Sequence, residues 1–157
     1  MHPVALLLLS TTHTRLLAPG GVKVTGGKIL ILEDDPFIAD MYARILRDDG
    51  NDVTVCTRFE DAREHLRHDH PDAVLTDVRV GEYNGLQLAL LFRRYSPEGR
   101  VVVVTGYDDV VIRKEVDDLQ GEFLLKPIRI AQLKAAFAAS DRIHQLPPAS
   151  EGVGTHV

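Results

Sequence analysis

The sequence predicts an α/β fold in which a five-stranded parallel sheet lies between two layers of helices. Short, continuous apolar runs alternate five times with segments of helical periodicity. The runs lack the alternation of a half-exposed strand, which indicates burial on both faces, and the short connections favour parallel pairing. The expected strands are 28–32, 53–56, 73–76, 101–104 and 123–125. The expected helices are 36–49, 59–67, 85–95, 109–118 and a last one near 130–137.

The first strand–helix unit has well-marked ends. After the apolar run 28–32, Asp35 is a good helix cap, and Pro36 fits the first helical position, where no backbone N–H is needed. Gly50 is typical of the residue that ends a helix. The apolar residues between them recur at helical spacing: Ile38, Met41, Tyr42, Ile45 and Leu46.

The second and third units carry weaker helix signals. The strand at 53–56 precedes a charged helix whose inward face holds Ala62 and Leu66. In the third unit, Asn84 and Gln87 resemble a capping box that opens the helix after the strand.

The fourth and fifth units complete the sheet. The fourth strand, 101–104, is the most β-branched run in the chain. The helix at 109–118 has a poor apolar pattern. The strand at 123–125 precedes a final helix lined by Ile130, Leu133 and Phe137.

Composition excludes several classes of protein. The net charge is −5, so we expect no nucleic acid partner. Cys56 is the single cysteine, which excludes a disulfide framework and favours a reducing compartment. No apolar run approaches the roughly 18 residues of a membrane span, so we expect no membrane partner and a cytoplasmic location. The run 4–9 resembles a short signal-peptide core but lacks a preceding basic residue and a clear cleavage site.

The two ends of the chain differ from its repeating middle. Residues 1–27 show no clear period and are expected to form a disordered extension, unless translation begins later, near residue 22 or 24. Residues 146–157 are rich in Pro, Gly and Ser, typical of a flexible tail. One domain is therefore expected at 28–145.

Five polar side chains follow directly after the predicted strands. Glu33 and Asp34 follow the first, Asp77 the third, Thr105 the fourth and Lys126 the fifth. Because the carboxyl ends of parallel strands meet at one edge, where ligands bind in open α/β sheets, these side chains are expected to converge.

Such a set of groups suits phosphoryl transfer to a carboxylate. Neighbouring carboxylates repel unless a cation joins them, and a ligand set made only of oxygens favours Mg²⁺. A carboxylate can attack phosphorus, while a metal, an ammonium and a hydroxyl stabilise charge on the transferred group. With Lys126 and Thr105 as helpers, Asp77 is predicted to form an aspartyl phosphate.

The same residues resemble the response-regulator receiver family. Four segments carry the resemblance, in family order and spacing, over about residues 28–143. They are ILILEDDP at 29–36, LTDVR at 75–79 with NG at 84–85, VVTG at 103–106, and FLLKP at 123–127. The resemblance implies a flavodoxin-like, doubly wound sheet with strand order 2-1-3-4-5.

The resemblance also implies a donor and a metal site. Asp77 would receive the phosphoryl group from a phosphohistidine on a sensor histidine kinase or a histidine phosphotransfer protein. Mg²⁺ would be bound by Asp34, Asp77 and the backbone carbonyl of Arg79, with Glu33 acting through water.

A switch follows from the same resemblance. Lys126 would hold the phosphate and could form a cis peptide bond with Pro127. The Thr105 hydroxyl would swing towards the phosphate while Phe123 turns inward. The face formed by the fourth and fifth helices and the fifth strand would then change partners. Phe123 lacks a hydroxyl, so packing is expected to be its only switching force.

The sequence departs from the family pattern around the phosphoacceptor. Gly81 and Tyr83 stand where Pro and Met are common, which predicts a more mobile loop after Asp77. Arg79 and Tyr107 occupy positions that flank the phosphate, and both are bulky. Our hypothesis is that they restrict attacking water and prolong the phosphorylated state.

Three classes of function follow. The first is a stand-alone phosphorylatable signalling module, not an enzyme, whose output passes through contacts with an unknown downstream protein, since no output domain is expected after residue 145. It could equally serve as a relay intermediate or a phosphate sink. The alternative is a receiver-like binding module that works without phosphorylation. An aspartyl-phosphate phosphatase is disfavoured because Arg79 stands where its second Asp is needed. A flavin-binding protein, which belongs with the phosphatase in this third class, is disfavoured because the acidic residues after the first strand would repel phosphate.

Overall fold

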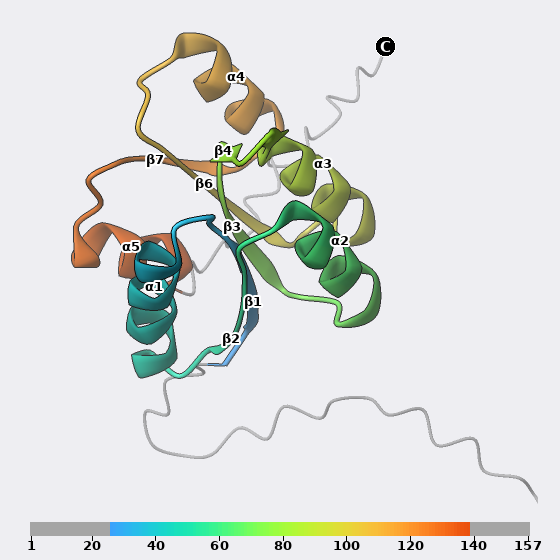
Figure 1. The fold of residues 1–157 in the computed structure, drawn as a ribbon, viewed down its shortest axis with the longest axis vertical. Coiled ribbons are helices and arrows are strands. Elements are labelled where there is room, and N and C mark those ends of the chain that lie inside the picture. The colour runs from blue at the N-terminus through green and yellow to red at the C-terminus, as the bar shows by residue number, and fades with distance from the viewer. Residues whose placement is uncertain (1–25, 139–157) are drawn as a thin grey trace, which may run out of the picture.

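A five-stranded parallel sheet forms the centre of the computed structural model, which describes residues 26–138. The sheet order is β2-β1-β3-β6-β7, which is 2-1-3-4-5 when only these strands are counted, as predicted (Figure 1). The sheet strands are β1 Lys28–Leu32, β2 Asp52–Cys56, β3 Ala73–Asp77, β6 Arg100–Thr105 and β7 Glu122–Leu125. The helices are α1 Pro36–Asp48, α2 Phe59–His68, α3 Leu86–Tyr95, α4 Val110–Asp118 and α5 Ile130–Phe137. Most of the expected 1–27 extension and the whole 146–157 tail lie outside the described residues.

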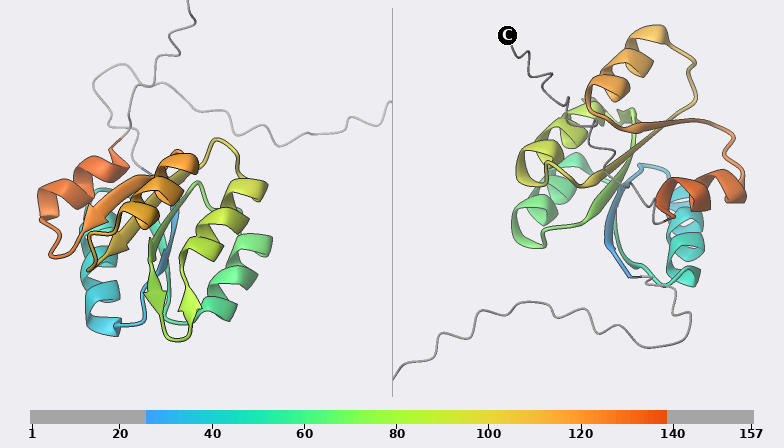
Figure 2. Two further views of the ribbon diagram at one scale, coloured as in Figure 1. Left: turned by 90° about the horizontal axis from the view of Figure 1, so that it is seen from above. Right: turned by 180° about the vertical axis from the view of Figure 1, so that it is seen from behind.

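Helices cover both faces of the sheet (Figure 2). Along β1, Leu30 and Leu32 point into a core shared with α2, α3 and α4, while Ile29 and Ile31 point into a core shared with α1 and α5. Because successive strand residues face opposite sides, a strand covered on both faces must be apolar throughout. This explains the continuous apolar runs of the sequence. Within the described residues, no helix is long and apolar enough to cross a membrane.

The helix ends agree with the predicted ones to within one residue. The Asp35 cap is confirmed, since its Oδ1 accepts hydrogen bonds from the backbone N–H groups of Phe37 and Ile38, at 2.9 and 3.2 Å. Gly50 follows α1 with φ +87°, a left-handed conformation that favours glycine.

The predicted capping box of α3 is wrong. Gly85, not Asn84, is the N-cap, and no side-chain cap bond is made there. Residue 85 must be glycine, because a Cβ there would lie 1.7 Å from the backbone oxygen of Asp77. Asn84 instead sits one residue earlier, and its Oδ1 accepts a hydrogen bond from Leu86 N at 2.9 Å.

A short hairpin between β3 and α3 was not predicted. Its strands, β4 Arg79–Val80 and β5 Tyr83–Asn84, pair antiparallel around Gly81 (Figure 1). Two-residue strands lie below the length at which alternation can be recognised, so the sequence pattern gave no signal. The greater mobility expected of this loop from Gly81 and Tyr83 stays a prediction.

Candidate functional site

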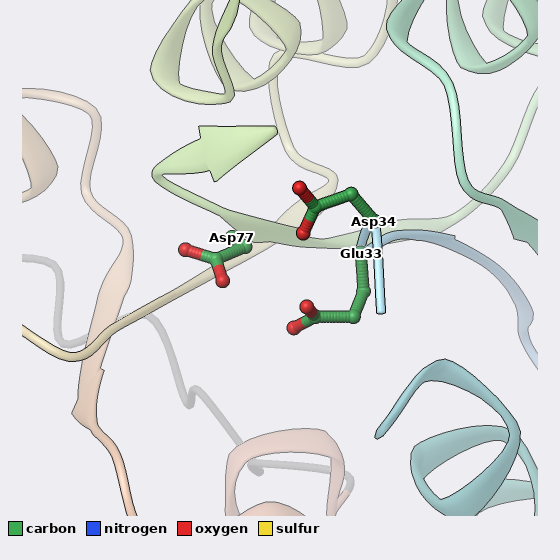
Figure 3. Close-up of side chains that lie close together, drawn as sticks. All are labelled: Glu33, Asp34 and Asp77. Atoms are coloured by element: carbon green, nitrogen blue, oxygen red, sulfur yellow. The ribbon is translucent and has the colours of Figure 1, made fainter. Parts of the chain in front are cut away.

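Three carboxyl groups gather at the carboxyl edge of the sheet. Glu33 and Asp34 follow β1, and Asp77 is the last residue of β3 (Figure 3). Each offers one oxygen, and these oxygens lie within 4.8 Å of one another. The edge predicted from the strand order therefore brings together the carboxylates that were expected to meet.

Lys126 reaches this cluster from the end of the edge strand β7. Its Nζ lies 2.7 Å from Glu33 Oε2 and also donates a short hydrogen bond to Asp77 Oδ2. Its backbone N–H donates to the Thr105 carbonyl at 2.8 Å, which fixes where the side chain leaves β7. The peptide bond between Lys126 and Pro127 is cis, as expected.

Burial makes the charges of this cluster strongly interdependent. Only 1% of Glu33 and 8% of Asp77 is exposed. Burial raises the pKa of Glu33 above its ordinary value, and nearby Asp77 adds to the rise, while Lys126 opposes it. Burial alone would lower the pKa of Lys126, but its hydrogen bonds to Asp77 and Glu33 outweigh that effect and raise the pKa.

The donor set fits a divalent cation. When ionised, the three carboxylates carry three negative charges, and Lys126 supplies one positive charge. Two negative charges remain unbalanced among these four side chains. Since every available ligand atom is an oxygen, a hard ion of the Mg²⁺ type suits the site.

The β4–β5 hairpin closes one side of the site through its backbone. Arg79 N donates to Asp77 Oδ1 at 3.0 Å, and Gly81 N donates to Asp34 Oδ2 at 3.2 Å. Sequence patterns did not reveal the second bond, because neither the hairpin nor the approach of its tip to β1 leaves a periodic signal.

The two proposed lifetime residues lie at the rim and connect to the buried Thr105. Thr105 is fully buried, and its Oγ1 accepts a hydrogen bond from Tyr107 N at 3.1 Å. The Tyr107 hydroxyl accepts a hydrogen bond from Arg79 Nη1 at 3.0 Å, and the Arg79 guanidinium lies 4.1 Å from the centre of the Tyr107 ring. The sequence placed both bulky residues beside the site but did not indicate that they contact each other.

Phe123 is held by more than packing. The Arg113 guanidinium lies 4.1 Å from the centre of its ring, and Arg113 Nε lies 2.6 Å from Asp108 Oδ1. A cation–π contact therefore adds to the packing of Phe123, while packing as its only switching force stays a prediction. Arg113 stands on the poorly patterned helix α4, and nothing in the local sequence singled it out.

Comparisons with solved structures agree with this architecture. A response regulator from Burkholderia pseudomallei, solved with a phosphorylated aspartic acid, calcium ion and citrate, is 22% identical with a TM-score of 0.65, over 70% of this chain and 65% of that one. The BeF3-activated N-terminal receiver domain of RstA from Klebsiella pneumoniae is 28% identical with a TM-score of 0.61, over 69% and 92%.

Curated relatives are similar over most of this chain but are longer. The alginate biosynthesis transcriptional regulatory protein AlgB of Pseudomonas aeruginosa is 30% identical over 134 residues, which is 83% of this chain and 29% of AlgB. The DNA-binding response regulator MtrA of Mycolicibacterium smegmatis is 28% identical over 78% of this chain and 54% of MtrA. This chain thus spans about half or less of these relatives.

The family model for the response regulator receiver domain matches residues 29–138. The match begins within β1 and runs through α5, so it includes the three carboxylates, Thr105 and Lys126. The chain belongs to the response regulator receiver family.

Proposed function

We propose that this chain accepts a phosphoryl group on Asp77 from a phosphohistidine of a sensor histidine kinase or a histidine phosphotransfer protein, with Mg²⁺ as cofactor. One observation carries the proposal. The Asp77 carboxylate is at once within 4.8 Å of two further carboxylates and hydrogen-bonded to the buried end of Lys126. A structural acid needs a counter-charge but not two neighbouring acids, and this surplus of negative charge supports a cation-dependent reaction.

The side chains divide the work of transfer. An Asp77 carboxylate oxygen forms the new bond to phosphorus as the bond from phosphorus to the imidazole nitrogen breaks, and that nitrogen keeps the electron pair. Lys126 moves from balancing Glu33 and Asp77 to balancing the oxygens of the transferred group. Thr105 supplies a hydroxyl at the next strand end. When bound, Mg²⁺ would be held by Asp34, Asp77 and the Arg79 carbonyl, with Glu33 acting through water, and would neutralise the phosphoryl oxygens.

The output is proposed to be a change at the face formed by α4, β7 and α5. Thr105 and Phe123 are proposed to connect the site to this face. The face exposes large apolar side chains, and these are Val110, Val111, Leu125 and Ile130. An apolar surface of this kind suits a protein partner, and the downstream protein is expected to bind there. A cytoplasmic location and the lack of a nucleic acid or membrane partner stay predictions.

A phosphoacceptor fits this site better than a phosphatase. The residue two positions after Asp77 is Arg79, and a guanidinium cannot act as a general acid at neutral pH. Arg79 is instead engaged by the Tyr107 ring and hydroxyl. We therefore expect a stable phosphorylated state rather than rapid turnover.

The test is phosphorylation with a small phosphodonor. The purified chain, incubated with acetyl phosphate and Mg²⁺, is expected to gain the mass of one phosphoryl group. Asp77→Asn should gain none, and chelation of Mg²⁺ should abolish the gain in the parent. Asp48→Asn is the matched control, because Asp48 is an exposed residue on α1. Full labelling of Asp77→Asn, or labelling that ignores Mg²⁺, would refute the proposal and favour a module that works without phosphorylation.

A further inference from the structure

Asp34 is held differently from the other two carboxylates of the site. Glu33 and Asp77 are buried and both contact Lys126, whereas Asp34 is exposed. Among residues 26–138, its carboxylate has one hydrogen-bond donor, the backbone N–H of Gly81, at 3.2 Å from Oδ2. The orientation of Asp34 therefore depends on the position of the hairpin tip.

Gly81 makes this bond in a conformation that few residues adopt. Its φ is +56°, and a Cβ added there would meet no atom within 4 Å. Backbone conformation rather than space thus selects glycine at the hairpin tip. Proline is common at this position in the family, but it cannot reproduce the tip of this chain, because its φ is fixed near −65° and it has no N–H to donate to Asp34.

Tyr83 fixes the hairpin on helix α2. Its ring stacks on Phe59, with ring centres 4.8 Å apart and planes 10° from parallel. Phe59 is the first residue of α2 and is only 6% exposed, so it is a firm base. The proximity of the Tyr83 hydroxyl and the Glu60 carboxylate lowers the pKa of Glu60 and raises that of Tyr83. The stack on Phe59 holds β5, and through it the tip.

We propose that the Gly81 N–H, kept in place by the stack of Tyr83 on Phe59, orients Asp34 for binding the divalent cation. This inference rests on the proposed function, since it concerns the same cation. The bond uses Oδ2 and leaves Oδ1 open to the ion. Groups that orient a ligating carboxylate typically contribute about 10- to 100-fold to metal affinity. Gly81 and Tyr83 are thus positioning residues, and neither needs to touch the ion.

The experiment is a Mg²⁺ titration of the whole chain. Calorimetry measures the affinity, and the carboxyl ¹³C resonance of Asp34 reports on the environment of that carboxylate. Gly81→Pro removes the donor and is expected to weaken Mg²⁺ binding about 10-fold. Gly81→Asn is the matched control, because asparagine tolerates a left-handed backbone and keeps the N–H. It should bind Mg²⁺ nearly as the parent does, because the donor to Asp34 is kept. The Asp34 resonance of the metal-free chain should shift in Gly81→Pro and not in Gly81→Asn.

A second pair of variants covers the case in which Gly81→Pro does not fold. Tyr83→Ala removes the stack and should weaken Mg²⁺ binding, whereas Tyr83→Phe keeps it and should bind nearly as the parent does. If the parent binds Mg²⁺ and Tyr83→Ala binds it equally well, as does Gly81→Pro where it folds, the positioning role is overturned while the proposed function stands. If the parent itself binds no Mg²⁺, the proposed function fails first.

Discussion

The site has an inner group and an outer rim, and they are built differently. The inner group, Glu33, Asp77, Thr105 and Lys126, comes from strand ends and is buried or half-buried. The outer rim, Asp34, Arg79 and Tyr107, is exposed and is connected through loop backbone and one Arg–Tyr contact.

The inner group and the rim differ in how much each side chain depends on its neighbours for a counter-charge. In the inner group, one ammonium serves two buried carboxylates, so removing Lys126 leaves both carboxylates without a counter-charge. In the rim, each contact is partly solvated and contributes about 0.5–1 kcal/mol. Substitutions of the inner charged residues should therefore alter both stability and chemistry, whereas substitutions at Arg79 and Tyr107 should alter only rates.

The largest effect is expected for Lys126→Met. Without Lys126, Glu33 and Asp77 face each other with no cation, which should lower the free energy of unfolding by about 3 kcal/mol at pH 7 without Mg²⁺. Urea denaturation measures this loss. Added Mg²⁺ should restore part of the lost stability, because a divalent ion can replace the missing charge. We expect no phosphorylation of Lys126→Met, even with Mg²⁺ present.

Lys134→Met is the control for removing a paired lysine. Lys134 lies 2.7 Å from Asp49 Oδ1, and both side chains are partly exposed. This substitution should cost less than about 1 kcal/mol and should leave phosphorylation intact. Equal losses in the two variants would show that the inner group is no more tightly coupled than an ordinary surface pair.

The pH dependence of stability should expose Glu33. A carboxyl whose folded-state pKa is raised is protonated more readily in the folded chain than in the unfolded one, so it favours folding at low pH. That contribution is complete below the ordinary value near 4.5 and is lost as pH rises through the raised pKa. In the absence of Mg²⁺, the free energy of unfolding of the parent should therefore fall relative to Glu33→Gln as pH rises above 4.5.

The measurement is a series of urea denaturations of both chains across pH 4 to 8, roughly the range in which a raised carboxyl titrates. We expect a smaller change than for Lys126→Met, because Lys126 offsets part of the burial of Glu33. Mg²⁺ should flatten the difference by favouring the ionised form. Parallel curves for parent and variant without Mg²⁺ would mean that Glu33 titrates as in the unfolded chain.

The same division explains what could be predicted from sequence. Glu33, Asp77, Thr105 and Lys126 each follow an apolar run, and parallel strands must end at one edge, so their convergence follows from strand order alone. The rim depends on loop conformation. The left-handed φ of Gly81 is a property of a single turn residue and leaves no periodic signal. No periodicity relates the residues of the Tyr83–Phe59 stack or of the Arg113–Phe123 contact. The predicted capping box also failed, because Asn84 Oδ1 accepts a hydrogen bond from Leu86 N rather than from Gln87 N.

The rim itself should control the lifetime of the phosphorylated state. Arg79→Ala and Tyr107→Ala each remove a contact of about 0.5–1 kcal/mol, so phosphate should be lost about two- to fivefold faster. Tyr107→Phe keeps the ring under Arg79 and should change less. Tyr95→Ala, an exposed residue on α3, is the control. The decay of the labelled chain is measured after the phosphodonor is removed, and decay as slow as that of the parent in both alanine variants would rule out shielding.

The smallest effect is expected for Arg113, whose guanidinium lies over the ring of the proposed switch residue Phe123, as that of Arg79 lies over Tyr107. If Phe123 must leave its place under Arg113 when the site is loaded, the cation–π contact opposes loading by about 0.5–1 kcal/mol. Arg113→Leu should then raise the apparent affinity for beryllofluoride with Mg²⁺ about two- to fivefold, measured by the ring resonances of Phe123. For Arg113→Lys, which lacks the planar guanidinium, the affinity should lie between those of the parent and Arg113→Leu.

Asp108→Asn, which frees Arg113 from its carboxylate partner, should also raise the affinity for beryllofluoride, but less strongly. The effect of Arg113→Leu should vanish in a Phe123→Leu background, because the two residues would act through one contact. An effect that persists there would assign Arg113 to α4 packing and leave the switch to Thr105 and the inner group.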